Sequence, residues 1–170
     1  MIELLKYTIP ALVVLLTAWI VLNKLLKEER ARREYELRRK DREITNPIRL
    51  RGYERLALML ERIEPEHLLT NVDFSNMTLQ DLQRYLLQTI RLETDHNLSQ
   101  QIYVSQQTWQ LIILARDEMA NFINSIALQM PKNSTTLQFA QTLITAYNQN
   151  GETPTQKAKL QLRQEAAQLL

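Results

Sequence analysis

The chain has no cysteine among its 170 residues, and it has only two glycines, five prolines and two histidines. Without cysteine it can form no disulfide bridge, no thiolate zinc site and no thiol nucleophile. Glycine is the residue that the turns of hairpins require, so its scarcity disfavours β-structure. Leucine, glutamine, glutamate, arginine and alanine are abundant instead, and these residues favour helix. We therefore predict an all-α protein with one small domain and an accessory segment.

Charge is absent from residues 7–23 (YTIPALVVLLTAWIVLN), and leucines extend the apolar run on both sides. About 20 apolar residues match a hydrocarbon core about 30 Å thick. Lysines at both ends can reach the membrane surface. We predict that residues 1–26 are a transmembrane anchor that contacts membrane lipid through residues 4–26. A cleaved signal peptide and a buried core helix are the competing interpretations.

Basic residues lie almost entirely on one side of this run. Nine lysines and arginines lie between Lys24 and Arg42, whereas Lys6 alone precedes the run. Such an excess marks the cytoplasmic side of a membrane segment. We therefore predict a single-pass protein of the bacterial inner membrane, with its N-terminus outside and its C-terminal domain in the cytoplasm.

Residues 27–45 carry many charges and no apolar stripe, so burial cannot hold them in place. Four glutamates precede a basic residue by four positions, and each such pair stabilises a helix by about 0.2–0.5 kcal/mol. The pairs are Glu28 with Arg32, Glu29 with Arg33, Glu34 with Arg38, and Glu36 with Lys40. We predict a charged helical spacer. The alternative is a contact with anionic lipid or nucleic acid, made by Arg30, Arg32, Arg33, Arg38, Arg39, Lys40 and Arg42. The interleaved glutamates disfavour both.

A cytoplasmic helical domain of about five helices is predicted for residues 46–170. Asn46 and Pro47 form a cap and first-turn pair, which predicts that the spacer ends there and a new helix begins. Further starts are predicted by a Thr78–Asp81 capping box, by Ser105, and by the pair Thr153–Pro154. The helix that follows Thr78 is predicted to run through Gln101, and short loops between these helices are typical of a bundle.

Both histidines occur in the motif Glu-x-x-His, as Glu64 with His67 and Glu93 with His96. This spacing places a carboxylate and an imidazole one helical turn apart, as in the ligand pairs of di-iron bundles. Such a site also needs two further glutamates, and Pro65 interrupts the first motif. A metal-dependent bundle enzyme is therefore kept as an alternative, and we predict no resident cofactor.

No other pattern indicates catalysis. The serines lack an evident histidine and aspartate partner, and the two glycines are isolated, so no nucleophile triad and no phosphate loop is predicted. We predict that the chain is not an enzyme. The polar residues around His96 are open to two interpretations, which are internal packing or helix capping and a partner-binding surface.

Two blocks of the sequence resemble a known family. NPIRLRGYERLALMLERIEPEHLL (46–69) and IRLETDHNLSQQIYVSQQTW (90–109) resemble single-pass membrane proteins of Bacteroidota that carry a domain of unknown function. The resemblance implies an anchored helical domain and no activity. It also suggests a set of candidate partner-binding residues: Arg51, Tyr53, Arg55, His96, Asn97, Gln100, Gln101, Tyr103 and Trp109.

These observations favour a membrane-anchored helical adaptor or scaffold that binds a protein partner at the cytoplasmic face of the inner membrane. Self-association into a homo-oligomer stays open, and nucleic acid is not an expected partner. A third interpretation is a stalk-like subunit of a membrane complex, as in rotary ATP synthases. The prolines at 47, 65, 131 and 154 disfavour one continuous stalk.

Overall fold

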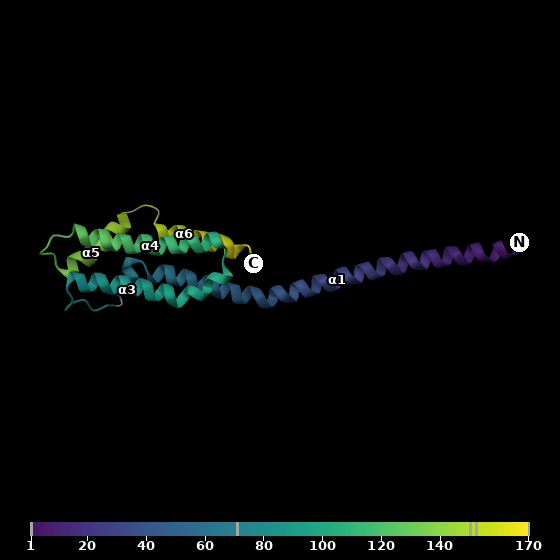
Figure 1. Cartoon of the computed structure of the whole chain (residues 1–170), viewed down its shortest axis with the longest axis horizontal. Coiled ribbons are helices and arrows are strands. Elements are labelled where there is room, and N and C mark those ends of the chain that lie inside the picture. The colour runs from purple at the N-terminus through teal and green to yellow at the C-terminus, as the bar shows by residue number, and fades with distance from the viewer. Residues whose placement is uncertain (1, 71, 150, 152, 170) are drawn as a thin grey trace. The chain divides into compact units, whose positions relative to one another are not determined.

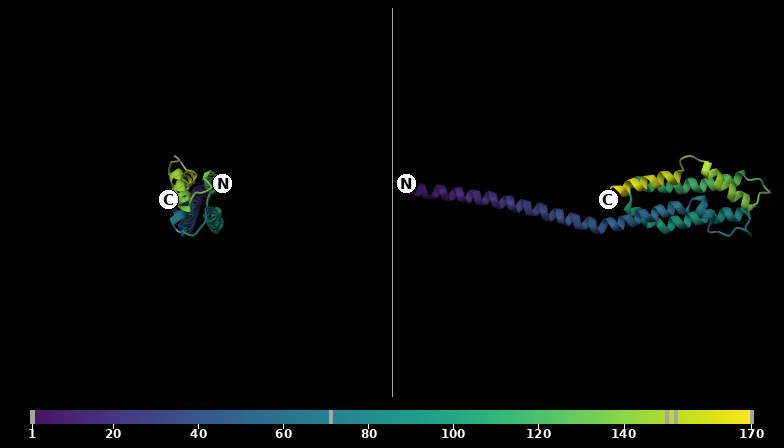
Figure 2. Two further views of the ribbon diagram at one scale, coloured as in Figure 1. Left: turned by 90° about the vertical axis from the view of Figure 1, so that its left-hand side faces the viewer. Right: turned by 180° about the vertical axis from the view of Figure 1, so that it is seen from behind.

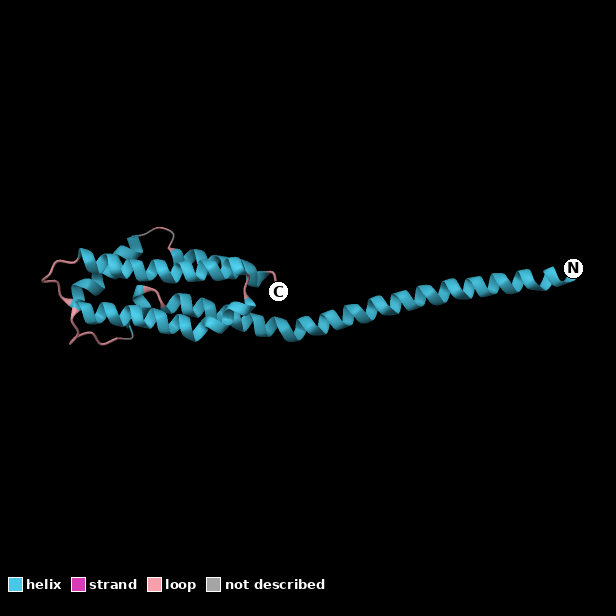
Figure 3. Ribbon diagram, viewed as in Figure 1, coloured by secondary structure: helices cyan, strands magenta, loops and turns pink. Residues whose placement is uncertain are grey.

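The structure is a computed structural model that describes residues 2–70, 72–149, 151 and 153–169, without the side chains of residues 1–11, 13, 14 and 42. Every regular element in this part of the chain is helical (Figure 3), which confirms the all-α prediction. The chain divides into two units, Met1–Thr45 and Asn46–Leu170.

The first helix, α1 (Ile2–Arg62), includes residues of both units. The break predicted at Asn46 and Pro47 is therefore wrong. Pro47 has no N–H to donate to the carbonyl four residues earlier, so α1 continues through it with one hydrogen bond missing. Proline marks a probable helix boundary rather than a certain one.

Exposed ion pairs four residues apart run along the charged part of α1. Two of the predicted pairs form, Arg33 with Glu29 at 3.0 Å and Arg38 with Glu34 at 4.0 Å. Arg32 pairs with Glu36 at 3.1 Å instead of with Glu28. Because these pairs are exposed to water, each adds only a few tenths of a kcal/mol to helix stability.

Among the residues that the structure describes, no helix is both long enough and apolar enough to span a bilayer. The predicted location in the inner membrane, with a single pass, an outside N-terminus and a cytoplasmic domain, is therefore wrong. A span takes about 20 mostly apolar residues. Much of the predicted anchor lies outside the described side chains, and the apolar run that is described from Leu15 ends at Asn23 and Lys24.

Six further elements form the unit Asn46–Leu170 together with the end of α1. They are α2 (Pro65–Thr70), α3 (Leu79–Asn97), the 3₁₀ helix η1 (Leu98–Tyr103), α4 (Gln106–Gln129), α5 (Thr136–Gln149) and α6 (Pro154–Ala167). In Figure 1 the end of α1 and α3 form one layer of this unit, and α4 and α6 form the other. The view from behind in Figure 2 shows the same two layers.

The predicted caps position these helices. Thr78 and Asp81 form a reciprocal capping box before α3, and Thr153 and Gln156 form another before α6. The Ser105 side chain caps α4. The prediction that α3 runs through Gln101 is wrong, because the α-helix ends at Asn97 and the chain tightens into η1.

The core of the unit Asn46–Leu170 lies between the two layers. Leucine, isoleucine, methionine and phenylalanine side chains from all the α-helices are buried there, and α4 contributes along its whole length. The fully buried members with the largest side chains are Phe139, Leu56, Met59, Leu60, Ile63, Leu82, Leu86, Ile112, Met119, Ile123 and Leu143. Burial of each such side chain contributes about 1.5–3 kcal/mol, which is what holds the helices together.

Candidate functional site

A groove of about 500 Å³ runs between α1 and α6 on the surface of the unit Asn46–Leu170. Its lining is mainly apolar at the base and charged toward the rims. The lining residues are Leu50, Tyr53, Glu54, Ala57, Leu58, Glu61, Lys159, Leu162, Arg163 and Ala166. The exposed fraction of Leu58 is 49%, whereas that of Leu162 is 2%. Leu58 therefore supplies exposed apolar area at the groove, whereas Leu162 is buried beneath it.

Three hydrogen bonds show that α1 and α6 run antiparallel along this groove. The Asn46 amide donates to the carbonyl of Leu169 at 2.7 Å. The Tyr53 hydroxyl donates to Glu165 at 2.8 Å, and Lys159 donates to Glu61 at 2.7 Å. The two helices are thus joined through polar side chains, while small residues such as Ala57 leave the space between them open.

At one end of the groove the Glu165 carboxylate reaches the N-terminus of α4. It accepts hydrogen bonds from the backbone N–H of Ser105 at 2.7 Å, from the Ser105 hydroxyl at 3.0 Å and from the Thr108 hydroxyl. Its fourth donor is Tyr53. A negative charge at a helix N-terminus is stabilised by the unpaired N–H groups and the helix dipole. We call Tyr53, Ser105, Thr108 and Glu165 the Glu165 cluster.

The Glu165 carboxylate is held in its charged form. Burial alone would raise its pKa, but hydrogen bonds from Thr108, Tyr53 and Ser105 together lower it below the usual value of a glutamate. The pKa of Tyr53 is raised, because the phenol is buried and lies beside the Glu165 charge. The phenol therefore stays a donor, and the carboxylate stays an acceptor.

Close packing surrounds this end of the groove. Arg49 donates to the carbonyl of Tyr103 at 3.3 Å and to the Tyr53 hydroxyl at 3.4 Å. The ring of Tyr103 lies against Gly52, where a Cβ atom would come within 2.7 Å of Tyr103 Cδ2. Glycine at this position allows η1 to approach α1 closely.

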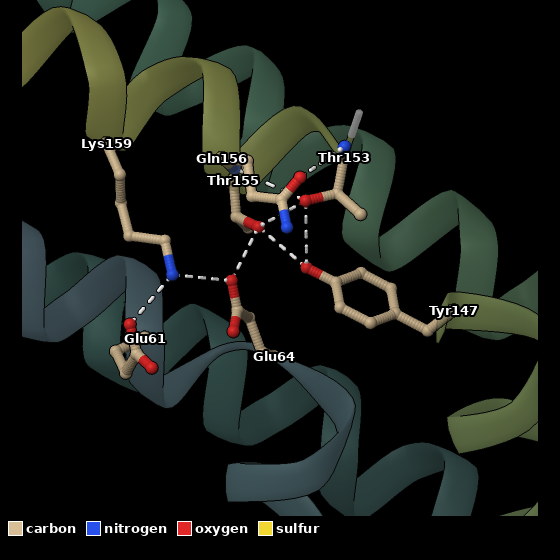
Figure 4. A network of polar contacts seen from close by, with 7 residues as sticks. All are labelled: Glu61, Glu64, Tyr147, Thr153, Thr155, Gln156 and Lys159. Carbon is tan, nitrogen blue, oxygen red and sulfur yellow. Dashed lines mark hydrogen bonds and ion pairs between the residues drawn. The ribbon is translucent and has the colours of Figure 1, made fainter. Parts of the chain in front are cut away.

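A second polar cluster lies at the other end of the groove (Figure 4). Lys159 Nζ lies 2.7 Å from Glu61 Oε2 and 2.9 Å from Glu64 Oε1. Thr155 donates to the same Glu64 oxygen at 2.7 Å, and its oxygen lies 2.7 Å from the Tyr147 hydroxyl. Thr155 is fully buried. We call Glu61, Glu64, Tyr147, Thr155 and Lys159 the Lys159 cluster.

The Lys159 ammonium is the cation of this cluster. Burial alone would lower the pKa of Lys159, but hydrogen bonds to Glu61 and Glu64 and their charges raise it. The hydrogen bond from Lys159 is the main reason why the pKa of Glu61 is lowered. Ligand atoms of Glu61, Glu64 and His67 lie within 4.8 Å of one another, which is close enough for a metal ion. Lys159 already bridges the two carboxylates of that group, so a metal ion would have to displace it.

The structure does not join the two Glu-x-x-His motifs. The first contributes Glu64 and His67 to the group just described, together with Glu61. In the second, Glu93 lies 3.4 Å from Arg62, and His96 is exposed on α3. The break between α1, which ends at Arg62, and α2, which begins at Pro65, places Glu64 outside both helices, so the first motif lacks the regular helix geometry that a di-iron bundle requires.

The nine predicted partner-binding residues fall into three sets by burial. Tyr53, Asn97 and Gln100 are buried, and the Asn97 amide donates to the carbonyl of Glu93 at 2.8 Å. Tyr103 and Trp109 are half-buried, and four of the residues are exposed. The exposed four are Arg51, Arg55, His96 and Gln101. Only Tyr53 lines the groove, and Arg51 and Arg55 lie on the same helix beside it.

Sequence reasoning missed Glu165, Lys159, Thr108 and Thr155. All four are ordinary surface residues of an amphipathic helix when the sequence is taken alone. Ser105 gave a partial signal, because a capped helix N-terminus favours a nearby anion. The carboxylate that fills that place lies 60 residues further along the chain, and no local pattern predicts it.

No curated protein and no solved structure matches the chain. A family model described as a family of unknown function, DUF7935, matches residues 1–169. The chain therefore belongs to the DUF7935 family.

Proposed function

We propose that this chain, a DUF7935 protein of Bacteroidota, is a helical adaptor that binds a segment of another protein in the groove between α1 and α6. The observation that carries the proposal is the groove itself, which is about 500 Å³ in volume and keeps Leu58 half-exposed. Ligand and peptide sites are typically concave and apolar, with a few polar groups that fix orientation.

Two features of the groove support a binding role over a catalytic one. The charged groups at its ends, Glu165 and Lys159, are each occupied by several partners within the chain. Neither is left free to transfer a proton or attack a substrate. The two clusters instead fix the distance between α1 and α6, which gives the groove a rigid frame.

Site-specific photocrosslinking of the full chain in its native cells tests the proposal. A photoreactive amino acid replaces Leu58 at the groove, and Leu128, which is 86% exposed on α4, serves as the matched control position. We expect one partner protein to crosslink at position 58 and not at position 128. A partner identified by mass spectrometry is then purified and must bind the wild-type chain.

A filled groove provides the second control. Ala57→Trp places a large ring in the groove lining, and we expect it to abolish both the crosslink and the binding of the purified partner. Equal crosslinking at both positions, or unchanged binding by Ala57→Trp, would contradict the proposal. Circular dichroism of the variant checks that the helices are retained.

A further inference from the structure

Residues 12–26 of α1, in the unit Met1–Thr45, expose a large apolar surface. Nine large apolar side chains between Leu12 and Leu26 are each 50–66% exposed. The core of the unit Asn46–Leu170, by contrast, buries leucine and isoleucine side chains almost completely. A contiguous apolar patch of this kind marks a surface that binds another molecule.

Five of these side chains form a regular stripe along α1. Leu12, Leu15, Trp19, Leu22 and Leu26 follow one another at intervals of three, four, three and four residues. Residues at these intervals lie on one face of an α-helix, and the alternation of three and four is the spacing of the seam between the helices of a coiled coil. We call these five residues the α1 stripe.

The polar residues of the same segment lie away from the α1 stripe. Thr17 and Lys24 are exposed, and each lies midway between two consecutive members of the stripe, two residues from either. Because two residues correspond to about 200° around an α-helix, both polar side chains lie on the opposite face. Asn23 lies at the edge of the stripe. A helix that packs on the stripe therefore leaves Thr17 and Lys24 in water, whereas a surrounding apolar phase would bury them.

The α1 stripe ends where the charged part of the helix begins. At the same spacing, the residues that follow Leu26 are Glu29 and Arg33, which are exposed and pair with each other at 3.0 Å. The stripe is therefore limited to about 20 Å of helix. A partner that matches it needs an apolar stripe of the same length beside charged residues, and a second copy of α1 has one.

The apolar area is sufficient for such a pair. Burial of one large apolar side chain removes about 100 Å² from water. The α1 stripe and its flanking neighbours Leu16 and Leu25 then supply about 700 Å² per copy, and each partner of a stable complex contributes about 600–1,000 Å². Because α1 is already helical from Ile2 to Arg62, association requires little further ordering of the backbone.

We propose that this chain self-associates through the α1 stripe, which packs against the α1 stripe of a second copy. Side chains of each stripe fill the spaces between those of the other, and Trp19 is the middle residue of the contact. Thr17, Lys24 and the charged residues from Glu29 onward remain in water. The inference is independent of the adaptor function proposed above, since it uses none of the groove residues. Each assembly then carries at least two grooves.

Sedimentation of the full chain in detergent-free buffer tests the inference. We expect the wild type to sediment as a whole multiple of 20.1 kDa that dissociates on dilution. Leu22→Lys places a charge in the contact and should weaken association by about a hundredfold. Val21→Lys is the matched control, because Val21 is 55% exposed and Leu22 is 58% exposed, but Val21 lies outside the α1 stripe. Neither change removes core packing, and circular dichroism checks that the helices are retained.

Crosslinking through introduced thiols locates the contact. The chain has no cysteine, so Leu22→Cys and Val21→Cys each carry a single thiol. A short bifunctional maleimide should join two copies through position 22 and not through position 21.

Three results would overturn the inference. A monomer at every concentration would show that no second copy binds the α1 stripe. Equal effects at positions 21 and 22, in sedimentation or in crosslinking, would show that copies aggregate without a defined contact. A monomer that floats with phosphatidylcholine vesicles, and no longer does so in Leu22→Lys, would show that lipid covers the stripe instead.

Discussion

The Glu165 cluster and the Lys159 cluster both join α6 to α1, but they do so with different chemistry. Glu165 is held by four hydrogen bonds from neutral donors, of which three lie at the start of α4 and the fourth is Tyr53 of α1. Lys159 is held by two carboxylates. In the first cluster Tyr53 and Thr108 are buried and lose their acceptor if the carboxylate is removed, whereas Ser105 is exposed to water. In the second cluster the side chains of Glu61 and Lys159 are 44% and 25% exposed, so water can replace part of the interaction. The difference predicts a rigid end and a softer end of the same groove.

The largest expected effect comes from removing the carboxylate of the Glu165 cluster. Glu165→Ala leaves Tyr53 and the fully buried Thr108 without an acceptor, and it removes an anion from a helix N-terminus. Each buried donor without a partner costs about 1–3 kcal/mol, so we expect a loss of about 3 kcal/mol in the free energy of unfolding. Urea denaturation of Glu165→Ala and of the exposed neighbour Gln164→Ala measures it. Equal stability of the two variants would show that the cluster does not hold the helices together.

The second prediction concerns packing at the same rigid end. Alanine normally stabilises a helix relative to glycine by about 0.5–1 kcal/mol. At Gly52, however, the added Cβ would meet the ring of Tyr103 at 2.7 Å and its Cβ at 3.1 Å. We expect Gly52→Ala to destabilise the chain by about 1–3 kcal/mol. In a Tyr103→Ala background the same change should be neutral or stabilising. Thermal unfolding of the wild type, the two single variants and the double variant measures the sign of the effect of Gly52→Ala in each background.

The sequence predicted the helices of the second unit better than the contacts between them. The caps at Thr78, Ser105 and Thr153 are local, since each side chain bonds a backbone group three residues away. The prolines at 131 and 154 also gave correct boundaries. Pro47 did not, because a proline removes one hydrogen bond and α1 retains the others.

The candidate site depends on contacts that no local pattern contains. Glu61 and Lys159 are 98 residues apart, and Thr108 and Glu165 are 57 residues apart. A sequence with 19 acidic and 21 basic residues offers many such pairs, and the fold selects among them. The Glu-x-x-His motif led to the opposite error. The motif is local and easy to find in the sequence, but the structure does not bring its two copies together into one site.

The third prediction tests the softer end. Lys159→Met keeps the stem of the side chain and removes its charge from Glu61 and Glu64. Thr155 still donates to Glu64, and water can reach Glu61, so we expect a loss of about 1 kcal/mol, smaller than that of Glu165→Ala. Arg163→Met on the same helix is the matched control, because Arg163 forms no ion pair among the described residues. Chemical denaturation at neutral pH compares the two, and a loss in Lys159→Met as large as in Glu165→Ala would remove the contrast between the clusters.

The smallest effects, and the sharpest separation of the clusters, come from pH. The pKa of Glu165 is lowered in the folded chain, so its contribution to stability is present above the pKa of an unfolded glutamate and is lost as the pH falls through the folded value. The pKa of Lys159 is raised, so its contribution is present below the pKa of an unfolded lysine and is lost as the pH rises through the folded value. The free energy of unfolding, measured as a function of pH, falls on an acid limb and on an alkaline limb. We expect Glu165→Gln to flatten the acid limb and Lys159→Met to flatten the alkaline limb. Because the pKa of Glu61 is also lowered, through its hydrogen bond from Lys159, Lys159→Met should flatten part of the acid limb as well, whereas Glu165→Gln should leave the Lys159 part of the alkaline limb unchanged. An acid limb that neither variant alters would show that neither carboxylate is linked to folding, and the difference between the two ends of the groove would then have to arise from packing alone.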